Sequence, residues 1–208
     1  MILTDAVERY LADLHAPTDP VLEAMRAHGE RDGIPIVAPE TGALLEVLAT
    51  AIGAQRAVEI GTAIGVSTLH LARGGAHVTS FEVDRERHEA ARGYLEQAGL
   101  SDRVDLRLQD ATTGLRSLEP PFDLAFVDGP KLSYDEHVER CLELLRPGGL
   151  LLVDNALMGG SVAGAPGGWS GASVENQRAL NARLLADPRL RATVSAVGDG
   201  VAIAVLVR

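Results

Sequence analysis

Apolar residues recur at two different spacings along the chain, and the change of spacing divides it into two parts. In the first fifty residues they recur three and four positions apart, which is typical of amphipathic helices. We predict helices over residues 3–14, from residue 20 onward, and over residues 39–52, because Asp19-Pro20 and Pro39 are helix-start signals. From residue 56 onward, short apolar runs typical of strands alternate with helical segments.

The second part predicts a mostly parallel sheet. Expected strands cover residues 57–60, 77–83, 104–108, 123–127 and 150–153. Expected helices between them cover residues 66–73, 85–98, 113–118 and 134–145. Strands that alternate with helices in this way form a parallel sheet covered on both faces. We therefore expect an α/β fold.

The end of the chain breaks this alternation. After a helix at about 174–186, two strand-like runs at 192–197 and 201–207 are separated only by Gly198-Asp199-Gly200. So short a connection makes an antiparallel hairpin. We predict a seven-stranded sheet with an antiparallel C-terminal hairpin. The length of 208 residues predicts a single domain, with a helical segment at 1–53 and the α/β core at 54–208.

Composition narrows the class of protein and its partners. Apolar residues make up 46% and charged residues 23%, as in ordinary globular proteins, and no apolar run is long enough to span a membrane. The first residues lack a secretory signal, so we expect a cytoplasmic protein. The single cysteine, Cys141, excludes an internal disulfide and a cysteine-cluster metal site. With 19 basic and 29 acidic residues, the net charge of −10 disfavours nucleic acid as a partner.

Each predicted parallel strand ends with an acidic residue. These residues are Glu59, Glu82 with Asp84, Asp110, Asp128 and Asp154. In an open parallel sheet the carboxyl ends of the strands form the ligand site. One acid at such a place is commonly a helix N-cap. Acids at all five strand ends of one edge exceed what capping needs, and they predict a metal, a positively charged ligand, or both.

The first two strand ends point to a ribose-bearing ligand. The turn Gly61-Thr62-Ala63-Ile64-Gly65 is glycine-rich but is not the G-x-G-x-x-G fingerprint. Glu82, at the end of the second strand, is placed to accept the hydroxyls of a ribose. S-adenosylmethionine (SAM) fits both observations, since it has a ribose, no pyrophosphate and two cationic groups. An NAD-dependent oxidoreductase stays an alternative that Glu82 fits and the missing fingerprint does not.

The fourth and fifth strand ends predict a metal site and a base. Asp128, Asp154 and Asn155 supply three oxygen ligands, which suit Mg²⁺ or Ca²⁺ better than zinc. Three residues after Asp128 is Lys131, the only lysine among the 19 basic residues. A nearby divalent cation disfavours the ammonium form, so Lys131 is a candidate general base. The alternative is a salt bridge between Lys131 and one of the carboxylates.

Together, four segments resemble the cation-dependent class I SAM O-methyltransferases, which include caffeoyl-CoA and catechol O-methyltransferases and bacterial relatives. The matching segments are 58–62 with 65–67, 122–128 with Lys131 and Tyr134, 144–149 with 154–155, and 197–200. The resemblance implies a Rossmann-like class I methyltransferase fold with extra N-terminal helices. It also implies a homodimer, for which the apolar stripe of Leu3, Val7, Leu11 and Leu14 offers a surface.

The resemblance assigns roles to particular residues. It implies that SAM contacts Val37, Glu59, Gly61, Ser67, Glu82, Asp110, Ala111, Thr112 and Asp128. It implies that Asp128, Asp154 and Asn155 hold the divalent cation, with Mg²⁺ expected and Ca²⁺ or Mn²⁺ as alternatives. Lys131 would then activate the hydroxyl of a small phenolic, catechol-like acceptor.

Two departures from the family pattern concern the site, the first its contacts with SAM or the surroundings of the metal and the second the acceptor pocket. Gly129-Pro130 stands where many relatives have Ala-Asp, and 156–158 lacks the aromatic residue that many relatives carry. Trp169, in the glycine-rich loop 159–171, is a candidate to stack on an aromatic acceptor or to anchor that loop. Methyl transfer to hydroxylated uridine in tRNA is the alternative within the superfamily, which the net charge disfavours. A non-catalytic SAM-binding module is a further alternative.

Overall fold

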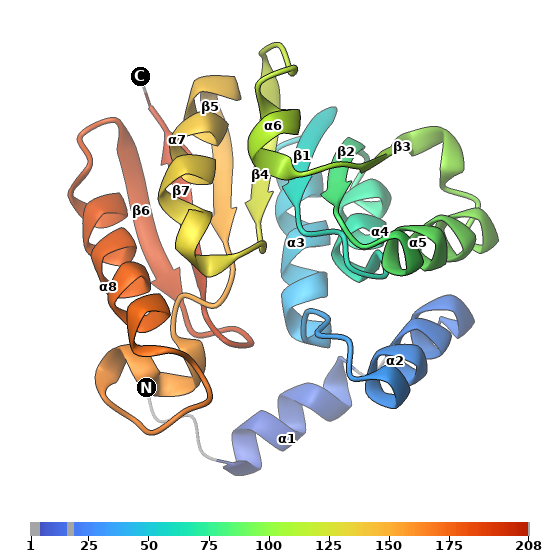
Figure 1. Cartoon of the computed structure of the whole chain (residues 1–208), viewed down its shortest axis with the longest axis horizontal. Helices are drawn as coiled ribbons and strands as arrows, with labels where there is room; N and C mark the ends of the chain where they lie inside the picture. The colour runs from blue at the N-terminus through green and yellow to red at the C-terminus, as the bar shows by residue number, and fades with distance from the viewer. Residues whose placement is uncertain (1–4, 16–18, 208) are drawn as a thin grey trace.

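The computed structural model describes residues 5–15 and 19–207 and shows a central seven-stranded sheet (Figure 1). Its strand order is β3-β2-β1-β4-β5-β7-β6. The strands are β1 (Arg56–Ile60), β2 (His77–Glu82), β3 (Val104–Leu108), β4 (Phe122–Val127), β5 (Leu145–Val153), β6 (Leu190–Ser195) and β7 (Val201–Leu206). Strands β1 to β5 are parallel, whereas β7 is antiparallel to both of its neighbours. The predicted mixed sheet with a C-terminal antiparallel hairpin is confirmed.

Helices cover both faces of this sheet (Figure 1). They are α1 (Asp5–Leu14), α2 (Pro20–Asp32), α3 (Pro39–Ala51), α4 (Val66–Arg73), α5 (Arg85–Gln97), α6 (Ala111–Leu115), α7 (Tyr134–Leu144) and α8 (Gly171–Ala186), with short 3₁₀ turns at Ser101–Arg103, Lys131–Ser133 and Met158–Ala163. None of the helices in this described part of the chain is long and apolar enough to cross a membrane.

Successive side chains of a strand point to opposite faces of the sheet, so the buried side chains form one hydrophobic core on each face. In β4, Ala125 and Val127 belong to the core under α6, α7 and α8, whereas Leu124 and Phe126 belong to the core under α3, α4 and α5. Because both faces are buried, the strand reads as an unbroken apolar run, which is why the sequence predicts it well.

The boundaries of several elements differ from the prediction, and the structure gives a reason for two of them. Strand β5 begins at Leu145 rather than at 150, because its pairing with β4 contains an irregularity that absorbs the Arg146-Pro147-Gly148-Gly149 segment. Helix α6 covers Ala111–Leu115 rather than 113–118, because the Asp110 side chain accepts a hydrogen bond from the Thr113 amide and caps the helix there. Leu3, in the first predicted helix, lies outside the described residues.

Candidate active site

A cavity of about 510 Å³ lies at the carboxyl ends of the parallel strands. It brings together eight of the predicted site residues, namely Gly61, Glu82, Asp110, Ala111, Asp128, Lys131, Asp154 and Asn155. Four other predicted residues do not line it: Val37, Glu59, Ser67 and Thr112. The acids at four of the five parallel strand ends therefore face one space, as the sequence pattern indicates.

The turn after β1 lets two strand ends approach closely. Gly61 has φ +96°, and a Cβ atom there would lie 2.4 Å from the carbonyl oxygen of Asp128. Only glycine fits this position, since it combines a left-handed backbone with a backbone neighbour that cannot move aside. The glycine therefore allows the ends of β1 and β4 to share one cavity wall.

Glu82 is held rigidly at the wall of this cavity. Its Oε2 accepts a hydrogen bond from the amide of Ala63 at 2.8 Å. Its Oε1 accepts from the amides of Val83 and Asp84 at 2.8 and 2.9 Å. Three backbone donors fix the carboxylate, which keeps lone pairs free for further donors such as the hydroxyls of a ribose.

Glu59 lies behind the cavity rather than on its surface. It is fully buried and accepts hydrogen bonds from the hydroxyls of Thr68 and Ser80, while its Oε1 has no partner. Burial raises the pKa of Glu59 to about 7, against the opposing effect of its hydroxyl donors. The side-chain alternation of β1 accounts for this position, because the adjacent Ile60 lines the cavity instead.

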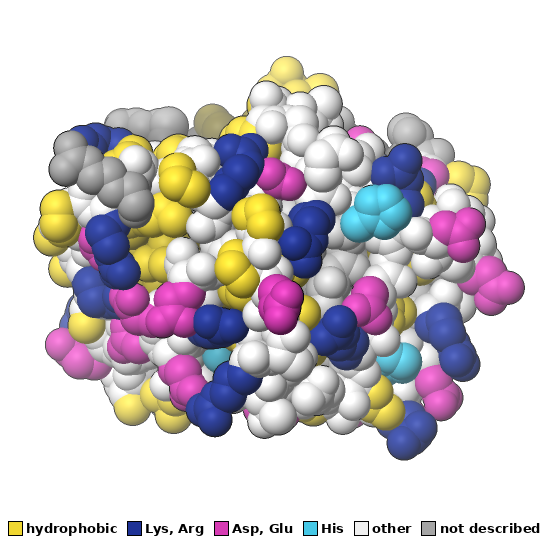
Figure 2. Space-filling model, turned by 90° about the horizontal axis from the view of Figure 1, so that it is seen from above, with side chains coloured by type: hydrophobic (Ala, Val, Ile, Leu, Met, Phe, Trp, Pro, Cys, Tyr) yellow, Lys and Arg dark blue, Asp and Glu magenta, His cyan; other side chains and the backbone are white. Residues whose placement is uncertain are grey.

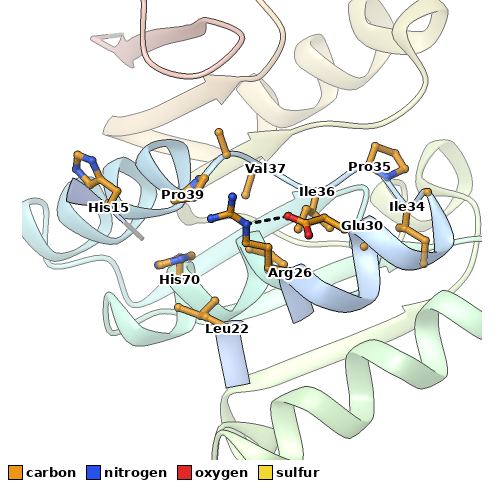
Figure 3. A pocket seen from close by; sticks show the side chains of 15 residues that line it. His15, Leu22, Arg26, Glu30, Ile34, Pro35, Ile36, Val37, Pro39 and His70 are labelled. Carbon is orange, nitrogen blue, oxygen red and sulfur yellow. Dashed lines mark hydrogen bonds and ion pairs between the residues drawn. The ribbon is translucent and has the colours of Figure 1, made fainter. Parts of the chain in front are cut away.

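Val37 lies on a second cavity, of about 500 Å³, between α2, α3 and segment 33–38 (Figure 3). The ion pair between Arg26 Nε and Glu30 Oε1, at 3.1 Å, stands at this cavity. Pro35 and Ile36 line both cavities, so the segment that carries Val37 separates the two spaces.

A histidine for which the sequence predicts no role also lines the active-site cavity. His137, on α7, lines the cavity, and its Nε2 lies 3.1 Å from Thr112 Oγ1. Its Nδ1 is buried without a partner, and burial lowers the pKa of the imidazole. No sequence signal separates this histidine from a core residue, since it lies in the middle of an amphipathic helix.

Asp128 and Asp154 form a crowded acidic pair. Burial raises the pKa of both carboxyls. For Asp154, burial and the negative charge of Asp128 together raise the pKa to about 7. Asp154 Oδ1 is buried and has no hydrogen-bond partner. Among residues 5–15 and 19–207, no three His, Cys, Asp or Glu side chains converge as metal ligands. The predicted ligand set of Asp128, Asp154 and Asn155 contains only two carboxylates, because its third member is a side-chain amide. These three oxygen ligands fit a hard divalent cation.

Lys131 is fixed beside this acidic pair. Its Nζ donates hydrogen bonds to Asp128 Oδ1 at 2.8 Å and to Tyr134 Oη at 2.5 Å. The ring centroid of Trp169 lies 5.7 Å from the same nitrogen, and Trp169 lines the cavity. The salt bridge that was the alternative role for Lys131 is therefore present. Tyr134 belongs to the motif noted in the sequence, but its contact with Lys131 is visible only in the fold.

Comparison with known proteins identifies the family. The model of the O-methyltransferase family matches residues 15–207. The chain belongs to the O-methyltransferase family. Among curated relatives, this methyltransferase is 31% identical to a catechol O-methyltransferase of Niastella koreensis, with 97% of each chain covered. It is 32% identical to tricin synthase 1 of Oryza sativa subsp. japonica, over 98% of this chain and 88% of the relative.

Solved structures agree with this assignment. The crystal structure of an O-methyltransferase from Bacillus cereus in complex with SAH is 31% identical, with 97% of each chain covered and a TM-score of 0.84. The predicted family, the class I methyltransferase fold and the enzyme class, a SAM-dependent O-methyltransferase, are confirmed. The NAD-dependent alternative is thereby set aside.

Proposed function

We propose that this methyltransferase transfers a methyl group from SAM to a hydroxyl of a small aromatic acceptor with adjacent hydroxyls, assisted by a divalent cation. The observation that carries the proposal is the single cavity that holds Glu82, the Asp128–Asp154–Asn155 set and Lys131. The catechol O-methyltransferase among the relatives supports the acceptor class.

We assign SAM to the part of the cavity formed by β1, β2 and β3. Glu82 would accept the ribose hydroxyls, and Asp110 and Ala111 would border the adenine. Gly61 would allow close approach of the methionine part to the backbone. Val37, Glu59, Ser67 and Thr112 do not line the cavity, and their contacts with SAM stay predictions.

We assign the cation to Asp128, Asp154 and Asn155. The unpartnered and buried Oδ1 of Asp154 supports a cation here, because it leaves an acceptor oxygen of the predicted ligand set free to bind one. Burial raises the carboxyl pKa values of both aspartates, and a bound cation would offset this cost of burying their charges. Mg²⁺ is the proposed ion, with Ca²⁺ or Mn²⁺ as substitutes. When bound, the cation would supply positive charge that favours ionisation of the acceptor hydroxyl.

Lys131 would act as the base in the transfer. Its neutral amine would take the proton from the acceptor hydroxyl, and the oxygen would attack the SAM methyl carbon in line as the carbon–sulfur bond breaks. The products would be the methyl ether of the acceptor, neutral SAH and protonated Lys131, which carries the positive charge that SAM loses. Tyr134 Oη and the Asn176 side chain, which donates to the Lys131 carbonyl at 2.7 Å, hold this lysine in place.

The variant Lys131→Arg tests this role. Arginine can keep the ion pair with Asp128 but cannot lose its proton at working pH, so kcat at pH 7 should fall by about 10²- to 10⁴-fold. Part of the activity should return towards pH 9.5, where hydroxide can ionise the acceptor. Near-normal turnover at pH 7 would show that Lys131 serves only as an ion-pair partner.

Two further proposals concern partners. Tyr10 and Leu14 on α1 and Val47 on α3 are exposed large apolar side chains, and we propose that this region pairs two copies of the chain. Nucleic acid remains a disfavoured partner. Figure 2 shows the end of the molecule away from the carboxyl ends of the parallel strands, and there basic and acidic side chains are interspersed and form no basic area of the kind that phosphate binding needs.

A further inference from the structure

Asp199 occupies the turn between β6 and β7, far in sequence from the proposed cation ligands but tied to them in space. The carbonyl of Asp199 accepts a hydrogen bond from the amide of Leu157, and the carbonyl of Gly200 accepts from that of Ala156, both at 2.9 Å. The turn is thus bound to the segment that directly follows Asp154 and Asn155. These two hydrogen bonds fix the position of the turn, and with it the start of the Asp199 side chain, relative to the cavity.

Both carboxylate oxygens of Asp199 are used within this segment. Oδ2 accepts a hydrogen bond from Asn155 Nδ2 at 3.1 Å, and Oδ1 accepts one from the amide of Gly159. An ionised carboxylate only accepts hydrogen bonds, so the nitrogen of the Asn155 amide must face Asp199. The amide oxygen of Asn155 must then face the other way.

The direction of this amide matters for cation binding. The two ends of an asparagine amide have nearly the same size, so packing alone does not choose between them. An amide oxygen is a ligand for a hard cation, whereas an amide NH₂ group repels one. Asn155 lines the cavity with Asp128 and Asp154, and its backbone has φ +58°, which fixes where its side chain starts.

We propose that Asp199 is a positioning residue that locks the Asn155 amide with its oxygen directed toward Asp128 and Asp154, completing the cation site. The inference rests on the proposed cation site. It gives a chemical reason for an acid in a hairpin turn that does not itself line the cavity. Positioning partners of this kind commonly change metal affinity by about 10- to 100-fold when they are removed.

Two variants test the pairing. In Asp199→Asn the side chain keeps its size but has one acceptor oxygen, which cannot serve both Asn155 and Gly159. The double variant Asn155→Asp with Asp199→Asn exchanges the two partners. In it the amide nitrogen at position 199 can donate to the carboxylate at position 155, while the amide oxygen at position 199 still accepts from the amide of Gly159. The exchange also preserves the net charge of the wild type.

Mn²⁺ alone serves as the probe, and its binding is measured from the loss of the free-ion electron paramagnetic resonance signal. We expect Asp199→Asn to weaken Mn²⁺ binding by about 10- to 100-fold and the double variant to recover most of that loss. Calorimetric SAH binding without metal should be the same in all three proteins.

The outcomes separate the inference from the proposed function. Failure of the wild type to bind Mn²⁺ would overturn the cation site and the inference together. Wild-type binding with unchanged affinity in Asp199→Asn would overturn the inference alone. A loss that the double variant does not recover, or that comes with weaker SAH binding, would show a general charge or folding effect and would also overturn it.

Discussion

Glu59 links the stability of this methyltransferase to pH in a way that can be calculated from its surroundings. The carboxyl is fully buried, and its pKa rises from an ordinary 4.5 to about 7 because burial disfavours the charged form. The folded state therefore keeps this proton over a range of pH in which the unfolded state has lost it. Stability must fall as pH rises from about 4.5 to about 7, and the loss is complete above that range.

The magnitude follows from the interval between the two pKa values. One pH unit corresponds to about 1.4 kcal/mol, so an interval of about 2.5 units costs about 3 kcal/mol of unfolding free energy at pH 8. Glu59→Gln removes this cost, because its amide oxygen can still accept from Thr68 and Ser80 and its nitrogen replaces an Oε1 that has no partner. A buried unpaired NH₂ carries a penalty of its own, but that penalty is the same at every pH.

Urea unfolding of the wild type and Glu59→Gln at pH 5 and pH 8 measures the effect. We expect the variant to gain about 2 to 3 kcal/mol relative to the wild type between the two pH values. The comparison cancels every other titrating group that the two proteins share. An identical pH dependence in both proteins would refute the reasoning, since it would show that Glu59 is already ionised in the folded state at pH 5.

Three further predictions concern ligands and assembly. Glu82→Ala should weaken SAH binding by about 10- to 100-fold, the effect of losing hydrogen bonds to a charged acceptor, and unchanged affinity in calorimetry would place the ribose elsewhere. Asp154→Ala should abolish cation-stimulated turnover while leaving SAH affinity intact, and full stimulation by Mg²⁺ in this variant would move the cation to other residues. Light scattering at micromolar concentration should give the mass of a dimer, and a monomer mass alone would reject pairing through α1 and α3.

The sequence predicts the sheet well because its strands are buried on both faces. Unbroken apolar runs such as that in β4 leave little choice of structure, and the short connection 198–200 fixes the antiparallel end. The start of β5 is less predictable, since Pro147 and two glycines end the apolar run while the backbone continues in the sheet through an irregular pairing.

The sequence predicts those site residues whose positions depend only on the direction of the parallel strands. Glu82 is the last residue of β2, and Asp128 and Asp154 directly follow β4 and β5, so the parallel order of these strands places all three at one cavity. Glu59 differs because it lies one position inside β1, where alternation turns its side chain into the protein. His137 and Asp199 reach the site through contacts between segments distant in sequence, and no local pattern reveals such contacts.

SAM consumption with a panel of phenols is the most direct test of the proposed reaction. The panel should include catechols and matched phenols with one hydroxyl, each measured with Mg²⁺ and with EDTA. We predict turnover of catechols with Mg²⁺, loss of that turnover with EDTA, and recovery when excess Mg²⁺ is restored. Turnover that EDTA leaves unchanged, or turnover of phenols with one hydroxyl in preference to catechols, would contradict the account.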